Sequence, residues 1–335
     1  MKKEARFWKT LSDSKVQCSL CSHRCKIDNK KVGICGVRRN ENGRLFSLIY
    51  GSCSSVAADP IEKKPLYHFH PGTNALSLGT VGCNFKCIHC QNYGISTASP
   101  DFSYMQEITP ERTIDLAKQY DCQGIAYTYN EPTIWHEFTF DSAKLAKKND
   151  LYTVYVTNGY ISENPLRELS SVLDAMNIDV KAFTNDFYKK VCKASLQPVL
   201  DTCVLAKELD IHVELTYLVI PGYNDSLKEV ENFCKWVFER LGKDVPIHFT
   251  RFHPDHNLID VPRTPMETML KVYDIAKRTG ILYCYLGNVP AGDYENTNCP
   301  KCGSTCVERN GFFVKNVGLK GNKCSKCGFS LPLID

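Results

Sequence analysis

From about residue 75 onward, short β-rich segments alternate with helical patterns, and this alternation restricts the fold more than any other feature of the sequence. The strand-like segments are ALSLGT (75–80), GIAYTYN (124–130), LYTVYVTN (151–158), MNIDVKA (176–182), HVELTYLVI (212–220), PIHFTRFH (246–253) and LYCYLGN (282–288). Strands that alternate with helices form parallel sheets through right-handed crossovers. Seven strands with about six helices fall short of a complete eight-fold barrel. The sequence therefore predicts an α/β fold, a partial (β/α)6-type TIM barrel.

The helical segments between the strands carry recognisable start and stop signals. Thr109-Pro110 and Thr264-Pro265 each place a threonine N-cap before a proline in the first turn. The segment 226–242 puts its apolar residues on one face and ends in glycine. We expect a helix after each of these threonines and an amphipathic helix over 226–242.

Composition and hydrophobic pattern indicate the cellular compartment of the protein. No run of about 18 apolar residues is present to span a bilayer, and the first residues lack the apolar core of about 7–15 residues found in secretory signals. The net charge of +4, with 23% charged residues, gives no argument for binding nucleic acid or a membrane surface. We expect a cytoplasmic protein, in which a content of 18 cysteines indicates metal binding rather than disulfides.

Three cysteines in the segment GCNFKCIHCQN (82–92) directly follow the first strand of the predicted barrel. Cys83, Cys87 and Cys90 therefore lie at the carboxyl edge of the sheet, where β/α proteins place their chemistry. A closed zinc site needs a fourth ligand, and His89 in so short a loop is poorly placed to supply it. Three thiolates on a cubic four-iron cluster leave one iron open for chemistry. The spacing favours the open cluster over zinc.

A second cysteine group lies near the C-terminus and consists of two CxxC pairs, Cys299 with Cys302 and Cys324 with Cys327. Each pair is followed by glycine, which lets backbone amides turn toward the sulfur atoms, as in zinc ribbons. Four ligands in two pairs make a closed structural site, and zinc is favoured over iron.

A third group lies near the start of the chain and contains Cys18, Cys21, Cys25 and Cys35. Its spacing fits zinc or an auxiliary iron–sulfur cluster. Zinc is preferred, because a short segment of loops without an apolar core needs a metal to fold. The seven remaining cysteines are interpreted as core residues. The predicted domains are an N-terminal Cys-rich metal-binding segment (1–72), the barrel (73–290) and a C-terminal zinc-ribbon-like domain (291–335).

Several longer motifs resemble one family of enzymes. These motifs are SLCSHRC, GICGVRRN, DPIEKKPLYHFHPG, GTVGCNFKCIHCQN, TYNEPTIW, TNGYI, IDVKAF, VIPGYND and CPKCG. The CxxxCxxC loop after the first barrel strand resembles the radical S-adenosylmethionine (SAM) superfamily. The full set, which covers essentially the whole chain, resembles the AmmeMemoRadiSam radical SAM enzymes, relatives of the pyruvate formate-lyase activating enzyme.

The resemblance implies a cofactor set and a reaction. Cys83, Cys87 and Cys90 would bind a [4Fe–4S] cluster whose open iron is chelated by SAM. One electron would cleave SAM to methionine and a 5′-deoxyadenosyl radical, which abstracts hydrogen from a substrate. An electron donor such as flavodoxin or ferredoxin is implied, together with AMMECR-type and Memo-type pathway proteins. The substrate is not named by the sequence, since relatives act on a glycine of a partner protein and others on peptides, RNA or small molecules.

The ends of the second and third strands offer contacts for SAM. Asn130 and Glu131 in YNEP stand where many superfamily members carry a Gly-Gly-Glu segment, and we expect Glu131 to meet the SAM ammonium. The alternative for Glu131 is an ordinary turn residue before a proline. Thr157 and Asn158 end the third strand and are candidate partners of the ribose hydroxyls or the carboxylate.

The later strands complete the predicted SAM site. Asp179 and Lys181 share one face of the fourth strand, and a lysine in an apolar strand needs an anion, which the SAM carboxylate would supply. Relatives use the matching aspartate for a monovalent cation, which stays undecided here. The alternative is an Asp179–Lys181 surface pair. Ile220 is expected to form an apolar wall for the adenine, and His253 matches a SAM-contacting histidine of a relative.

Three other functions stay open from the sequence alone. An iron–sulfur electron-transfer protein would have no use for Glu131, Lys181 and the apolar wall together. A zinc-dependent nucleic-acid-binding module would show salt-dependent affinity for RNA or DNA and no need for iron. A radical SAM enzyme that modifies nucleic acid is the third alternative.

Overall fold

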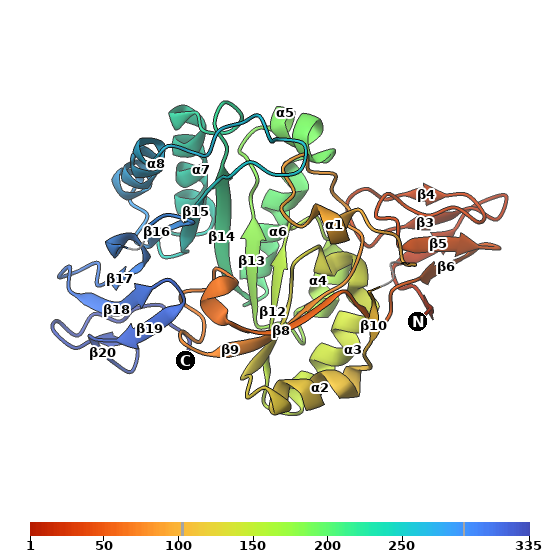
Figure 1. Ribbon diagram of the computed structural model, residues 1–335, viewed down its shortest axis with the longest axis horizontal. Coiled ribbons are helices and arrows are strands. Elements are labelled where there is room, and N and C mark those ends of the chain that lie inside the picture. Colours follow the sequence, from red (N-terminus) through yellow and green to blue (C-terminus); the bar gives the residue numbers. More distant parts are fainter. Residues whose placement is uncertain (102–103, 291) are drawn as a thin grey trace.

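The chain folds around an eight-stranded sheet that carries a small cysteine-rich module at each end (Figure 1). The computed structural model describes residues 1–101, 104–290 and 292–335. The parallel strands are β9 (Asn74–Gly79), β11 (Gly124–Tyr127), β12 (Tyr152–Thr157), β13 (Ala175–Asp179), β14 (His212–Val219), β15 (Ile247–Arg251) and β16 (Cys284–Gly287). They lie side by side in chain order. The seven predicted strands are therefore confirmed.

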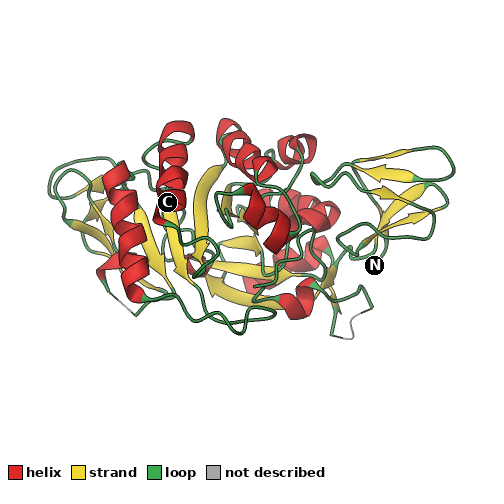
Figure 2. Ribbon diagram, turned by 90° about the horizontal axis from the view of Figure 1, so that it is seen from above, coloured by secondary structure: helices red, strands yellow, loops and turns green. Residues whose placement is uncertain are grey.

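Helices connect each parallel strand to the next, as the alternating pattern predicts (Figure 2). The longer ones are α2 (Pro110–Gln119), α3 (His136–Lys147), α4 (Glu163–Leu169), α6 (Gln197–Glu208), α7 (Leu227–Arg240) and α8 (Met266–Thr279). Shorter helical turns are η1 (Ile61–Lys63), α1 (Tyr93–Ser96), η2 (Pro132–Trp135), α5 (Asn185–Phe187), η3 (Tyr188–Cys192) and η4 (Asp293–Glu295). Because β16 and β8 form the two edges of this sheet, the barrel is partial, as expected.

One of the two predicted threonine caps is correct. Thr109 caps α2, where its hydroxyl accepts a first-turn amide hydrogen bond at 3.1 Å. The predicted cap at Thr264 is wrong, because α8 begins at Met266. The Thr264 hydroxyl instead accepts from the Phe252 amide at 3.0 Å and donates to the Val219 carbonyl at 2.6 Å. This residue ties together the loops that follow β14 and β15, at the end of the sheet where the cysteine loop lies.

An eighth strand, β8 (Ser55–Pro60), was not predicted and pairs antiparallel with β9. The residues after it, 61–70, fill the interior of the barrel at the amino-terminal ends of the strands. Leu66 and Phe69 from this segment pack in one buried cluster with Ala126 and other small residues of the strands. Part of the predicted segment 1–72 thus belongs to the sheet, and the three domain ranges stay a prediction.

Two buried carboxylates hold the segment 61–70 in place. Glu214 of β14 is fully buried and accepts hydrogen bonds from the Tyr67 and His68 amides at 3.0 and 2.7 Å. Lys64 is only 2% exposed, and its ammonium lies 2.7 Å from the Asp59 carboxylate. The charge of Lys64 is therefore paired in the protein interior.

The N-terminal module contains two antiparallel sheets. Their strands are β1 (Lys3–Glu4), β6 (Arg44–Ser47) and β5 (Arg38–Glu41) in one sheet, and β2 (Trp8–Thr10), β3 (Val16–Cys18) and β4 (Lys26–Ile27) in the other. Between them lies a small buried core that includes Val16, Leu20 and Leu45. The expectation of a loop segment without an apolar core is therefore wrong. A further pair, β7 (Ser52–Cys53) with β10 (Gln106–Glu107), joins this region to the barrel.

The C-terminal module lies at the opposite end of the sheet from the N-terminal one (Figure 1). Its strands are β17 (Thr297–Asn298), β18 (Thr305–Asn310), β19 (Phe313–Asn316), β20 (Leu319–Lys320) and β21 (Lys323–Cys324). The buried Arg309 of β18 donates a hydrogen bond of 2.7 Å to the Tyr67 carbonyl. This module therefore contacts the segment 61–70 inside the barrel. Among the described residues, the helices are all too short or too polar to cross a membrane.

Candidate metal and cofactor site

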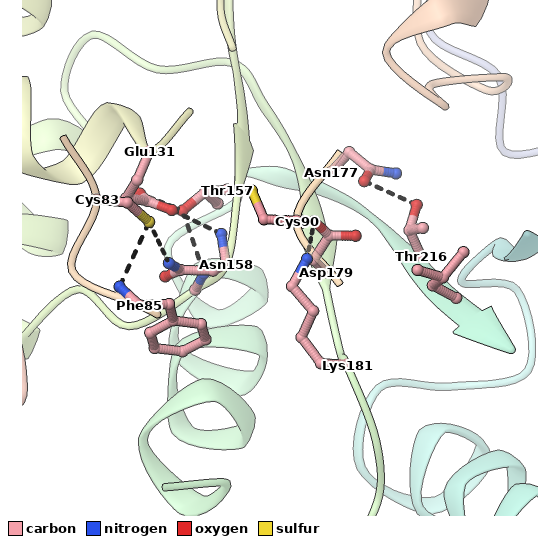
Figure 3. Close-up of polar contacts among 12 residues, drawn as sticks. Cys83, Phe85, Cys90, Glu131, Thr157, Asn158, Asn177, Asp179, Lys181 and Thr216 are labelled. Carbon is pink, nitrogen blue, oxygen red and sulfur yellow. Dashed lines mark hydrogen bonds and ion pairs between the residues drawn. The ribbon is translucent and has the colours of Figure 1, made fainter. Parts of the chain in front are cut away.

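The cysteine triplet lies on the loop between β9 and α1, at the carboxyl ends of the parallel strands. The Cys83 sulfur accepts a hydrogen bond from the Phe85 amide at 3.3 Å (Figure 3). The Cys90 thiol donates to the Ser96 hydroxyl at 3.7 Å. Among the described residues, the three sulfur atoms of the triplet lie too far apart to bind one metal ion together. All three side chains are half-buried on one short loop. This donor set suits a polynuclear cluster, which separates its thiolates more widely than a single ion does.

A fourth cysteine, Cys192, lies next to the triplet. It is fully buried at the end of η3, and its carbonyl accepts from the Lys86 amide at 2.9 Å. The hydrogen bond between its thiol and that of Cys87, together with burial, raises the pKa of Cys87 well above the usual range. The sequence interpretation treated Cys192 as an ordinary core residue. No local motif distinguishes it, since its neighbour Cys87 lies far away in the chain.

Glu131, predicted to meet the SAM ammonium, is fixed in the site by three hydrogen bonds. It is 1% exposed and accepts from the Thr157 hydroxyl at 2.7 Å and from the Thr133 and Asn158 amides at 2.8 Å each. Burial raises the pKa of Glu131, while these hydrogen bonds act in the opposite direction. After burial itself, the charge of Glu131 is the main factor that raises the pKa of Cys83. A cation that binds beside Glu131 would relieve both effects.

The amides of Asn130 and Asn158, also predicted as SAM contacts, hold the cysteine loop. Asn130 accepts from the Thr80 amide at 3.1 Å and donates to the Gly82 carbonyl at 2.8 Å. Asn158 donates to the Asn84 side chain at 2.7 Å. These two residues and Thr157 thus form the network around Glu131 and the loop. The sequence reasoning found the residues, but it did not foresee that they bind each other and the protein backbone.

Asp179 and Lys181 stand across the site from Glu131 (Figure 3). The Lys181 ammonium lies 2.6 Å from the Asp179 carboxylate. Their side chains are only 16% and 28% exposed, for the lysine and the aspartate respectively, so the alternative of a plain surface pair does not describe them. Burial alone would lower the pKa of Lys181, but the charges of Asp179 and of the Cys87 thiol raise it above the usual range. Lys181 therefore carries its positive charge beside the triplet.

The two remaining predicted residues lie at different depths. Ile220 is fully buried, and its amide donates to the Asn224 side chain at 2.6 Å, which fixes the turn after β14. His253 is half-buried after β15, and its Nε2 lies 3.0 Å from Nε2 of Gln91. Because Gln91 follows Cys90, His253 borders the end of the cysteine loop. The predicted SAM residues thus come from five different strand ends and gather at one edge of the sheet.

The four C-terminal cysteines have the spacing of a single-ion site. All four sulfur atoms lie within 4.8 Å of one another, with Cys299–Cys327 at 3.5 Å and Cys302–Cys324 at 3.7 Å. A tetrahedral ion with metal–sulfur bonds of about 2.3 Å separates its sulfurs by about 3.8 Å. Hydrogen bonds from Ser304 lower the pKa of Cys302 to about 6. This group can hold one metal ion.

Comparison with known proteins places the chain in a family. An uncharacterized protein of Methanocaldococcus jannaschii is 46% identical over 334 residues, which is 99% of each chain. The family model described as "Radical SAM superfamily" matches residues 77–237. The chain belongs to the radical SAM superfamily.

More distant relatives agree with this assignment. The pyruvate formate-lyase 1-activating enzyme of Escherichia coli strain K12 is 24% identical over 223 residues, which cover 59% of this chain and 87% of that enzyme. The crystal structure of a radical SAM methyltransferase from Sphaerobacter thermophilus superposes with a TM-score of 0.51 at 13% identity, covering 65% of this chain and 67% of the other. This likeness shows the fold. The predicted radical SAM fold and superfamily are confirmed, and membership implies a [4Fe–4S] cluster and SAM as cofactors.

Proposed function

We propose that Cys83, Cys87 and Cys90 hold a [4Fe–4S] cluster and that the protein cleaves SAM reductively. When bound, such a cluster supplies one electron to SAM, which yields methionine and a 5′-deoxyadenosyl radical that abstracts hydrogen from a substrate. One observation carries the proposal. A thiol triplet, a buried carboxylate at Glu131 and a charged lysine at Lys181 converge at one edge of the sheet. An electron carrier would need only the triplet.

The two opposite charges match the two ends of an amino acid. SAM carries an ammonium and a carboxylate on one carbon, and Glu131 and Lys181 offer a partner for each. Glu131 is held by three donors, so its charge is in place before a ligand arrives, which lowers the cost of reorganisation. Asp179 holds Lys181 in the same way. We assign recognition of the amino-acid part of SAM to Glu131 and Lys181.

The other predicted residues take supporting roles in this proposal. Asn130, Thr157 and Asn158 position the cysteine loop and Glu131, as their hydrogen bonds indicate. Ile220 supports an apolar wall for the adenine from beneath, and His253 borders the site beside Gln91. The C-terminal cysteines hold a structural zinc ion, for which their spacing is suited.

The substrate class that we favour is a partner protein. Similarity to an enzyme named for activating pyruvate formate-lyase supports hydrogen abstraction from a polypeptide. We further propose that the chain is an AmmeMemoRadiSam enzyme of the cytoplasm, with oxidoreductase chemistry. It would work with AMMECR-type and Memo-type proteins and take electrons from flavodoxin or ferredoxin. The long motifs of the sequence support this finer assignment.

Release of 5′-deoxyadenosine tests the proposal. The protein is reconstituted anaerobically with iron and sulfide, reduced with dithionite and mixed with SAM, and the products are separated chromatographically. Cys87→Ala is expected to abolish release. The matched control, Cys203→Ala, removes a fully buried thiol from α6 and should leave release intact. An intact cluster that releases no 5′-deoxyadenosine would contradict the proposal and favour an electron carrier.

A further inference from the structure

The four N-terminal cysteines surround a cavity that the proposed reaction has not used. The sulfur-bearing residues that line it are Cys18, Cys21, Cys25 and Cys35. Apolar side chains of Leu20, Ile27 and Ile134 complete much of the wall. The cavity therefore offers four soft ligands in an environment shielded from water.

The spacing of these four ligands differs from that of the C-terminal group. Among the described residues, the C-terminal cysteines are the one set of three or more ligand atoms that all approach within 4.8 Å of one another. The N-terminal four do not meet this condition, although all of them border the same cavity. A single tetrahedral ion needs sulfurs about 3.8 Å apart. Four thiolates that stand farther apart than one ion allows instead suit a cluster that binds one thiolate at each of four irons.

The wall of the cavity also presents hydrogen-bond donors to an anionic group. Arg38 and Asn84 both line it and are 1% exposed. Arg38 Nε and Asn84 Nδ2 are buried without a hydrogen-bond partner in the described structure, although the rest of the Arg38 guanidinium binds Glu137 at 2.8 and 3.0 Å. Orphaned buried donors are costly. Sulfide ions of a cluster would accept from both nitrogens, whereas a lone zinc ion brings no acceptor of its own.

The cavity shares a wall with the cysteine triplet. Asn84 lies between them, because it follows Cys83 and its carbonyl is 2.8 Å from Nε2 of His23. The two segments also touch directly, since a Cβ placed at Gly82 would lie 2.7 Å from the Cys35 carbonyl oxygen. A ligand in the cavity is thus separated from the triplet by one or two residues.

We propose that Cys18, Cys21, Cys25 and Cys35 bind a second [4Fe–4S] cluster, in place of zinc, and that this cluster exchanges electrons with the one held by the triplet. An external one-electron donor of low potential, such as a reduced ferredoxin or flavodoxin, reduces the second cluster. That cluster is then reoxidised as it passes the same electron to the first cluster. The binding site stands independently of the proposed function, whereas the electron exchange rests on it.

A variant without the triplet tests the binding site. Cys83→Ala, Cys87→Ala and Cys90→Ala are combined, and the protein is reconstituted anaerobically. We expect about four irons and four sulfides per chain, with the visible absorption and reduced-state EPR signal of a [4Fe–4S] cluster. Two zinc ions per chain and no iron would overturn the proposal. If the variant does not fold, the wild-type protein decides, with about eight irons expected and about four contradicting the second cluster.

A variant without the second site tests the electron exchange. Cys18→Ser combined with Cys35→Ser should lose about half of the iron and keep the EPR change that SAM causes at the first cluster. Reduced wild-type protein should show spin coupling between two clusters, which this variant lacks. Its 5′-deoxyadenosine release should fall more with reduced flavodoxin than with dithionite as donor. Equal loss with both donors, or a reduced wild type without spin coupling, would overturn the exchange. Loss of SAM cleavage from wild type itself would instead count against the proposed function.

Discussion

Replacing Glu131 by glutamine keeps the shape of the side chain but removes a negative charge that three hydrogen bonds hold beside Cys83. A hydrogen bond between charged groups contributes about 1.5–3 kcal/mol. Loss of the carboxylate–ammonium contact is therefore expected to weaken SAM binding by about 10- to 150-fold. Anaerobic calorimetric titration of SAM into the reconstituted protein measures this change.

The substitution also has a cost for stability, which a second variant separates from the effect on binding. The glutamine amide turns a donor toward groups that are themselves donors, so Glu131→Gln should lower the free energy of unfolding by about 1–3 kcal/mol. Glu214→Gln is the matched control, because Glu214 is equally buried and also accepts backbone amides, but lies at the other end of the barrel. It should lose stability and retain SAM affinity. If Glu131→Gln binds SAM within about twofold of wild type, the assignment of Glu131 to the ammonium is refuted.

Three further predictions concern other parts of the molecule. Burial raises the pKa of Glu62 from 4.5 to about 7, so its contribution to stability is present below pH 4.5 and lost as the pH rises through 7. Urea unfolding should show Glu62→Gln gaining about 3 kcal/mol on wild type between pH 4.5 and 8, and a constant difference would contradict this. Cys192→Ala removes a hydrogen bond from the Cys87 sulfur. The cluster proposed at the triplet should therefore survive, with a more negative reduction potential in an EPR redox titration. Loss of that cluster would show that Cys192 is a ligand. Cys302→Ala should lose the C-terminal zinc in metal analysis and retain 5′-deoxyadenosine release, and an unchanged zinc content would refute the ribbon site.

The barrel was predictable because its strands are β-rich runs set between helical patterns, and each run became a parallel strand. The same regularity fixed the site, since residues that follow consecutive parallel strands meet at one edge. Glu131 and Lys181 were therefore predicted to lie near the cysteine loop from the positions of their strands, together with the family resemblance. The hydrogen bonds from Thr157 and Asn158 to Glu131 were not predicted, because they depend on the packing of neighbouring loops.

Other features left no local signal in the sequence. The strands of the N-terminal module are two to four residues long, too short to show a period. Cys192 approaches Cys87 only because η3 folds back over the cysteine loop. Lys64 looks like a surface lysine until the chain turns so that Asp59 meets it inside the barrel. In each case tertiary contacts, rather than local pattern, decided the outcome.

The position of residues 61–70 has a consequence for any attempt to reduce this protein to a minimal catalytic core. This segment precedes the first parallel strand but occupies the barrel interior. A shortened chain that starts at residue 73 would therefore leave the amino-terminal end of the barrel open. Solvent and oxygen would then have a second route to the site at which we propose that SAM is cleaved. Residues 61–70 therefore close one end of the barrel and are not an accessory that can be removed.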